Sequence, residues 1–176
     1  AVLIFGGAFL FWIFERRALF AELSPGGQAL AALFSSVTAR TAGFNTVDTG
    51  ALSNGSLLLT MILMFIGGSP GSTAGGIKTT TVVVLLMYTW NSLRNKQGCS
   101  VFERRIPDEI IKKSSMVLVI NLLMALVAAI IICAVQPELS MNSIAFEICS
   151  AIGTVGMTCG ITRDLNGISR CVIIFL

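Results

Sequence analysis

Residues 115–135, SMVLVINLLMALVAAIIICAV, form an apolar run without a charged side chain. About 20 such residues carry an α-helix across the hydrocarbon core of a bilayer. Of the chain's 176 residues, 55% are apolar and only 12% are charged, which is about half the charged share of an ordinary soluble domain. Because so few charges cannot cover a soluble surface, the sequence predicts an all-α integral membrane protein.

Four further apolar segments, at residues 1–14, 51–66, 82–90 and 168–176, are each too short to cross unaided. The second and third of these, joined through the glycine-rich stretch between them, make roughly forty residues, enough for one interrupted crossing. The first and last look like helices cut short, and no basic signal-peptide region precedes the first. We therefore expect this chain to be a piece of a longer protein.

Two amphipathic stretches between the crossings carry helix-start signals. Ser24-Pro25 precedes QALAALFSSV, and Ser140 precedes MNSIAFEICSAI, so each serine is expected to cap a helix. Both helices are too short to cross and are suited to re-entrant segments. Each runs into a Thr-x-Gly segment, and the two segments align at an offset of 113 residues. The predicted unit is therefore helix, re-entrant loop, helix, present twice.

Each Thr-x-Gly segment would place non-helical backbone at membrane depth, where unpaired polar groups are costly in lipid. A short helix ending just before it directs a partial negative charge to the same point. Backbone carbonyls and that dipole together predict a cation site built like a potassium filter. The alternative is that Gly43 and Gly156 only allow helices to pack closely. The predicted filter residues, acting mainly through backbone carbonyls, are Thr41, Ala42, Gly43, Phe44, Thr154, Val155, Gly156 and Met157.

The segment MFIGGSPGSTAGGIKTTT at residues 64–81 lies between two apolar runs. A nucleotide-binding loop is disfavoured because one extra residue separates its last glycine from Lys78, and because the flanking runs replace the strand that such a loop needs. A continuous helix packed through its G-x-x-x-G face is disfavoured by Pro70 and the paired glycines.

The favoured interpretation is a break midway through a long crossing, on the cytoplasmic side of the filter. Its hydroxyl side chains would satisfy freed backbone groups or face a water-filled cavity, where Lys78 is tolerable. Such a loop would obstruct the pathway or swing aside, as an intramembrane gate. The predicted gate residues are Gly67, Gly68, Ser69, Pro70, Gly71, Ser72, Thr73, Ala74, Gly75 and Gly76.

The basic residues set the expected orientation. Half of the twelve Lys and Arg side chains fall within residues 91–113, namely Arg94, Lys96, Arg104, Arg105, Lys112 and Lys113. By the positive-inside rule this linker is cytoplasmic, so both re-entrant segments enter from outside.

The remaining chemistry of the sequence points away from catalysis. The chain has no His, and its five cysteines, Cys99, Cys133, Cys149, Cys159 and Cys171, show no CxxC spacing, so we expect small apolar fillers rather than a metal or redox site. No enzyme activity, cofactor or nucleic-acid partner is expected. Two rivals stay open: a membrane-embedded nucleotide-binding enzyme built on Gly71–Lys78, and a non-conducting helix-packing scaffold. Glu147 could steer cations or hydrogen-bond neighbouring backbone.

Three motifs together carry a resemblance over the whole chain. SSVTARTAGFNTVD, then MFIGGSPGSTAGGIKTTT, then SAIGTVGMTCGIT resemble the membrane subunit of the Ktr/Trk/HKT potassium transporters, closest to the KtrB type. That family has four helix–pore-loop–helix repeats around a pore with pseudo-fourfold symmetry. The resemblance implies that residues 1–90 are the third repeat, with its second helix broken at 67–76, residues 91–113 are the linker, and residues 114–176 are the truncated fourth repeat.

The resemblance also implies the function and partners of the complete transporter. It implies potassium uptake across the plasma membrane, a homodimer, and a cytosolic ring of nucleotide-binding regulatory subunits, and this piece alone should not conduct. The linker 91–113 is expected on the cytoplasmic side, where it could contact such a ring. Attraction of its basic side chains to anionic lipid explains the charges equally well. Sodium coupling is left open by the sequence.

Overall fold

The structure is a computed structural model that describes residues 1–176 apart from residues 73, 95–99 and 102–103. The predicted gate residue Thr73, together with Lys96 of the linker and Cys99, lies outside the described residues. The helices are α1 (Val2–Glu15), α2 (Pro25–Thr38), α3 (Asn54–Phe65), α4 (Thr79–Leu93), α5 (Asp108–Val135), α6 (Met141–Ile152) and α7 (Gly167–Phe175), with single 3-10 turns at Thr49–Ala51 and Ile161–Arg163.

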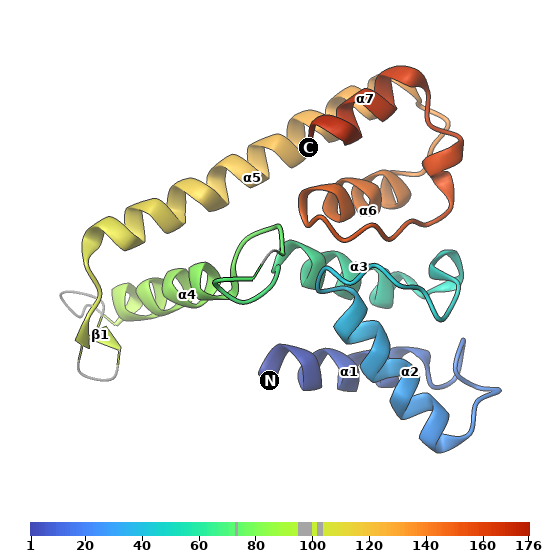
Figure 1. The fold of residues 1–176 in the computed structure, drawn as a ribbon, viewed down its shortest axis with the longest axis horizontal. Helices are drawn as coiled ribbons and strands as arrows, with labels where there is room; N and C mark the ends of the chain where they lie inside the picture. The colour runs from blue at the N-terminus through green and yellow to red at the C-terminus, as the bar shows by residue number, and fades with distance from the viewer. Residues whose placement is uncertain (73, 95–99, 102–103) are drawn as a thin grey trace.

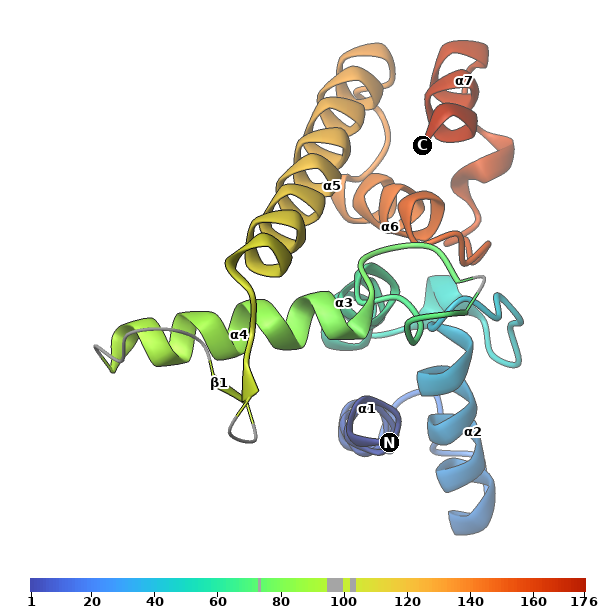
Figure 2. The same cartoon turned by 60° about the vertical axis from the view of Figure 1, so that its left-hand side comes forward.

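The helices form two groups that meet at α3. Helices α1 and α2 pack together, α1 also packs on α3, and α5 packs on both α6 and α7. Helix α3 contacts α6 as well, so it joins the two groups. In Figure 1 the long helix α5 runs along one side of the molecule, and α4 continues beyond the glycine-rich segment that follows α3. Figure 2 shows α4 extending away from the α1–α2 pair.

Serine caps begin helices α2, α3 and α6. The Oγ atoms of Ser24 and Ser140 accept the amide hydrogens of Gly27 and Ser143, at 3.3 and 3.2 Å. These bonds satisfy backbone donors that a helix start otherwise leaves unpaired, and both predicted caps are confirmed. Ser53 caps α3 in the same way, although its sequence context did not single it out.

Helix α5 is longer than its apolar run. It begins at Asp108 rather than near residue 115, and it places Asp108 and Glu109 in its first turn, where acidic side chains favour the positive end of the helix dipole. By length and composition, α5 is the one helix of the described residues that could cross a membrane, while α1, α3 and α6 are shorter apolar helices. Most of the surface of α5 is uncovered in this chain.

The linker contains a feature that the sequence interpretation did not foresee. Strands β1 (Ser100–Val101) and β2 (Arg104–Arg105) pair antiparallel, with Ser100 opposite Arg105. Elsewhere in the described part of the chain the named elements are helices.

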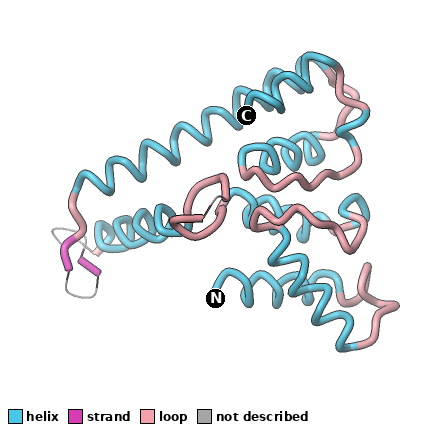
Figure 3. Tube along the Cα trace, viewed as in Figure 1, coloured by secondary structure: helices cyan, strands magenta, loops and turns pink. Residues whose placement is uncertain are grey.

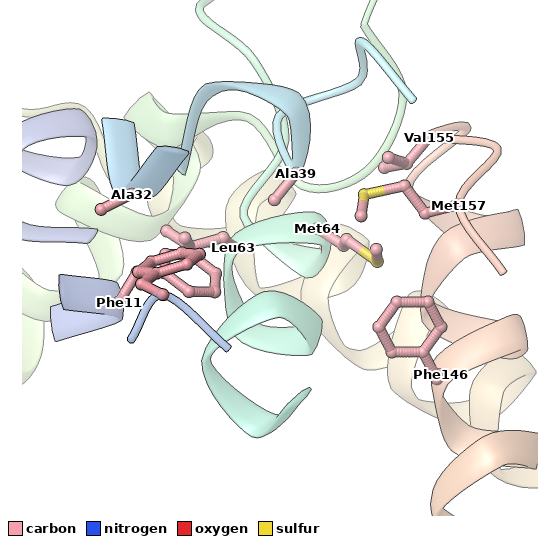
Figure 4. Close-up of a cluster of buried hydrophobic side chains, with 9 residues drawn as sticks. Phe11, Ala32, Ala39, Leu63, Met64, Phe146, Val155 and Met157 are labelled. Carbon is pink, nitrogen blue, oxygen red and sulfur yellow. The ribbon is translucent and has the colours of Figure 1, made fainter. Parts of the chain in front are cut away.

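The main hydrophobic core lies where the two groups meet. Met64 of α3 and Phe146 of α6 are both fully buried there. Figure 4 shows Met64 between the α1–α2 side of this cluster and the side chains of Val155 and Met157. Since Val155 and Met157 belong to the second Thr-x-Gly segment, the core directly holds that segment in place.

Candidate functional site

The two Thr-x-Gly turns, residues 41–44 and 154–157, share an unusual backbone conformation. Thr41 and Thr154 have φ angles of 70° and 52°, and among the described residues they are the only non-glycine residues with positive φ. Gly43 and Gly156 have φ angles of 73° and 85°. A β-branched residue is strained in this region, and such strain concentrates at functional sites. The repeat seen in the sequence is thus also a repeat of conformation.

The amides of both turns are directed back to the helix that precedes each turn. The amide groups of Ala42 and Gly43 both donate to the carbonyl of Thr38 at the end of α2, each at 3.2 Å. In the second turn, the amides of Thr154 and Val155 donate to carbonyls in the last turn of α6, at 3.0 and 2.9 Å. These bonds satisfy the amides of the non-helical backbone. They do not involve the carbonyl groups of the turn residues.

Six turn carbonyls are left free of donors. Within the described part of the chain, no hydrogen-bond donor contacts the backbone oxygens of Thr41, Ala42, Gly43, Thr154, Val155 and Gly156. The next carbonyl in each turn is occupied, because Thr38 Oγ1 donates to the Phe44 oxygen and Ser150 Oγ donates to the Met157 oxygen, both at 2.6 Å. A hydroxyl from each preceding helix therefore fastens the far end of each row of free carbonyls.

The two turns lie side by side. Gly43 approaches the carbonyl group of Val155 so closely that an added Cβ would overlap its oxygen. Further along, Thr49 Oγ1 donates a 2.6 Å hydrogen bond to the carbonyl oxygen of Thr158. Figure 3 shows the loops that follow α2 and α6 running next to each other. The structure thus brings together residues that are more than a hundred positions apart, at separations close to the offset of the sequence repeat.

One face of the second turn borders a cavity of about 900 Å³. Its lining includes Thr154 to Thr158, together with Glu147 and Thr162. The second turn therefore borders open space on one face, while its Val155 carbonyl lies against Gly43.

The glycine-rich loop, residues 67–76, is closed at its base by backbone pairing. Helix α3 ends at Phe65, and the carbonyl of Phe65 accepts the amide of Ile77 at 3.2 Å. The amide of Thr79 donates to the carbonyl of Gly68 at 3.3 Å. These bonds make a narrow neck, so the loop is a defined unit between α3 and α4.

Lys78 is turned back into the loop that it follows. Its Nζ donates to the carbonyl of Ser72 at 3.1 Å and to that of Ala74. The ammonium group is thereby engaged with backbone oxygens of its own chain. A nucleotide-binding loop instead uses this lysine for phosphate and follows a strand, whereas here helix α3 precedes the loop.

The same loop touches both turns. The amide of Gly75 donates to Thr154 Oγ1 at 2.9 Å, and Nη2 of Arg40, the residue before Thr41, donates to the carbonyl of Gly67 at 3.2 Å. The three segments singled out in the sequence therefore lie at one place.

The comparison with protein families decides the family of the chain. The family model described as "TrkH: Cation transport protein" matches residues 2–176. The chain belongs to this TrkH family. The resemblance stated from the sequence motifs is thereby confirmed, and the family is one of transporters rather than enzymes.

Individual members of the TrkH family align over nearly the whole chain. The chain is 40% identical, over 100% of its length, to "Potassium/sodium uptake protein NtpJ" of Enterococcus hirae. It is 37% identical, over 98% of its length, to "Ktr system potassium uptake protein B" of Vibrio alginolyticus. It spans 40% and 38% of those two proteins.

A solved structure agrees on the fold. The chain superposes on the potassium transporter TrkH from Vibrio parahaemolyticus with a TM-score of 0.77, covering 98% of this chain and 39% of that one, at 21% sequence identity. At this identity the likeness concerns the fold alone. The all-α class predicted from the sequence is confirmed, with the two short linker strands as an addition.

Two residues of this TrkH-family site had no assigned role in the sequence interpretation. Glu147 Oε1 accepts the hydroxyls of Thr158 and Thr162, the latter at 3.0 Å, so the carboxylate contacts side chains rather than the backbone groups considered for it. Arg40 was not singled out by the sequence pattern. Within the described residues, no group of three or more His, Cys, Asp or Glu side chains comes together.

Proposed function

We propose that the complete transporter containing this chain takes up potassium through a filter formed partly by the two Thr-x-Gly turns. The observation that carries the proposal is the repeated turn, in which six carbonyl oxygens receive no donor from the described residues and a strained threonine accompanies a positive-φ glycine. Carbonyl oxygens arranged in this way replace the hydration shell of a monovalent cation. The family and the printed names of its members support potassium or another monovalent cation as the transported ion.

The ion-facing groups would be the carbonyls of Thr41 to Gly43 and of Thr154 to Gly156. Helices α2 and α6 end beside the two turns, so their negative dipole ends favour a cation at this point. Phe44 and Met157 would end the rows, since their carbonyls accept hydroxyls from α2 and α6. A closed ring needs further turns around the axis, which the rest of the transporter would supply.

The glycine-rich loop would act as the gate. It follows α3 directly and touches both turns, which supports a position beside the proposed ion path. The neck keeps it a compact unit, so it would move as a whole rather than unravel. Opening would then be a change in the populations of seated and released loop conformers.

The assembly would lie in the plasma membrane with residues 91–113 on the cytoplasmic side. The length and apolar surface of α5 support a membrane location, and the basic side chains of the linker support its orientation. A homodimer and a cytosolic nucleotide-binding regulatory subunit complete the proposal, and they rest on the family resemblance alone.

The test is potassium uptake by the full-length parent in a strain that lacks other uptake systems. Gly156→Ser should weaken the preference for potassium over sodium, because a side chain at positive φ displaces the carbonyls. Gly26→Ser is the matched control, since an added Cβ at Gly26 meets no atom within 4 Å. Unchanged ion selectivity in Gly156→Ser would overturn the proposal.

A further inference from the structure

Arg40 links the first turn to the start of the glycine-rich loop. It directly precedes the strained residue Thr41, and its Nη2 donates to the carbonyl of Gly67 at 3.2 Å. A cavity of about 280 Å³ lies at this contact, with Arg40, Thr41, Gly68 and Ala74 among its lining residues. Any shift of the first turn therefore moves the donor that holds the loop.

The guanidinium of Arg40 is incompletely satisfied. Its Nε is buried and has no hydrogen-bond partner, and no carboxylate of the described chain forms an ion pair with it. Arg40 is half-buried, and a guanidinium whose buried Nε lacks a partner gains less from one carbonyl than a fully hydrogen-bonded guanidinium does. The contact with Gly67 is therefore one that a modest change in geometry can exchange for another.

Thr154 links the second turn to the end of the same loop. Its Oγ1 accepts the amide of Gly75 at 2.9 Å. Gly75 lies against the Thr154 side chain so closely that an added Cβ would overlap it. The positive φ of Thr154 aims the hydroxyl, so this contact depends on the filter conformation of the turn.

The two contacts lie at opposite sides of the loop's neck. Gly67 and Gly75 face each other, because a Cβ on Gly67 would overlap the carbonyl oxygen of Gly75. The neck is thus held on one side by the first turn, through Arg40, and on the other by the second turn, through Thr154. We call Arg40 and Thr154 the two anchors of the loop. Arg40 directly precedes Thr41, and Thr154 itself carries one of the free carbonyls.

We propose that Arg40 and Thr154 couple the position of the glycine-rich loop to ion occupancy of the two turns. In the seated position, which is the one observed here, the loop contacts both turns. A potassium ion bound by the turn carbonyls would hold both anchors in place and keep the loop seated, whereas an emptied turn would release it. This inference rests on the proposed function. Coupling of this kind is reciprocal, so it is measurable at the loop without measuring transport.

The experiment labels a loop cysteine in the full-length transporter. Ser69→Cys is introduced on the exposed part of the loop, in a background whose native cysteines are replaced by serine, and its reaction with a water-soluble thiol reagent is timed. Saturating potassium, compared with a large organic cation, should slow the reaction severalfold. Arg40→Gln and Thr154→Ala should each raise the labelling rate measured in potassium by roughly tenfold, because each removes one hydrogen bond that holds the loop. Both variants should also abolish the dependence of the rate on potassium.

Conservative variants keep the result interpretable. Arg40→Lys and Thr154→Ser retain the donor and the acceptor, so both should keep most of the potassium dependence. If Arg40→Gln fails to assemble, the Thr154→Ala and Thr154→Ser pair decides the matter by the same readout. A potassium effect that persists in Thr154→Ala, or that is missing from the parent, would overturn the coupling. If the coupling is overturned in this way but Gly156→Ser still alters ion selectivity, the proposed filter is retained.

Discussion

Thr49 and Thr158 join the segments that leave the two turns. Thr49 Oγ1 donates to the Thr158 carbonyl at 2.6 Å, although 109 positions separate them in the chain. Thr49 is only 3% exposed, and its Oγ1 also accepts a hydrogen bond from the side-chain amide Nδ2 of Asn45 at 3.3 Å. This hydroxyl therefore sets the spacing of two segments whose upstream carbonyls are left free.

Thr49→Val should destabilise the full-length transporter by about 1–3 kcal/mol, because it removes a buried hydroxyl and leaves the Thr158 carbonyl without its donor. The measurement is thermal unfolding of the purified protein in detergent. Thr49→Ser retains the hydroxyl and should keep most of the stability. Equal unfolding temperatures for Thr49→Val and the parent would contradict a role for this bond.

The two turn glycines should respond differently to alanine. At Gly43 an added Cβ would overlap the Val155 carbonyl, whereas at Gly156 it would meet no atom within 4 Å and suffer only the strain of φ +85°. We therefore expect Gly43→Ala to reduce folded yield strongly, and Gly156→Ala to assemble with a cost of about 1–2 kcal/mol. Yield and monodispersity after purification separate them, and a Gly43→Ala variant as well behaved as Gly156→Ala would contradict the close approach of the turns.

Glu147 should act as a brace rather than as a charge that attracts cations. It lies mostly buried in α6, 6% exposed, and its Oε1 accepts the hydroxyls of Thr158 and Thr162. Glu147→Gln keeps an acceptor at the same place and should lose little uptake, whereas Glu147→Ala should cost about 1–3 kcal/mol of stability. Uptake at limiting potassium decides: a Gln variant as impaired as the Ala variant would point to charge instead.

The sequence was sufficient for the features that depend on local pattern. The serine caps at Ser24 and Ser140, the break after the apolar run ending at residue 66, and the paired Thr-x-Gly segments all follow from residue type and spacing. Each involves interactions within a few residues, where propensity and capping rules apply.

Contacts between distant segments could not be read in this way. Nothing in the sequence pattern singled out Glu15, yet it is fully buried and its Oε1 accepts the amide and hydroxyl of Ser53, at 2.9 and 2.7 Å. Arg40 was not singled out either, and it contacts Gly67. Neither partner lies at helical or strand spacing from its residue, so no periodic pattern could indicate the pair.

Lys78 should be dispensable for uptake. Its Nζ holds the carbonyls of Ser72 and Ala74, so Lys78→Ala removes bonds that stiffen the loop and should leave potassium uptake present or raise it. Lys78→Gln retains a donor and serves as the control. Protection of the purified parent by a nucleotide, together with complete loss of uptake in Lys78→Ala, would instead favour the nucleotide-dependent rival.

Removal of the loop's outer part tests the gate directly. The neck is closed by the Phe65–Ile77 and Gly68–Thr79 backbone bonds, which lie outside Gly71–Gly75, so the deletion of those five residues should preserve α3 and α4. With the obstruction gone, potassium flux should rise severalfold. The preference for potassium over sodium should be kept, because the deletion removes no turn residue and costs the second turn only the Gly75 amide that Thr154 Oγ1 accepts. Radioactive potassium or rubidium flux into proteoliposomes measures this, with Ser69→Ala as a control that leaves the loop's length unchanged. A folded deletion variant whose flux equals or falls below that of the parent would rule out a gating role for the loop.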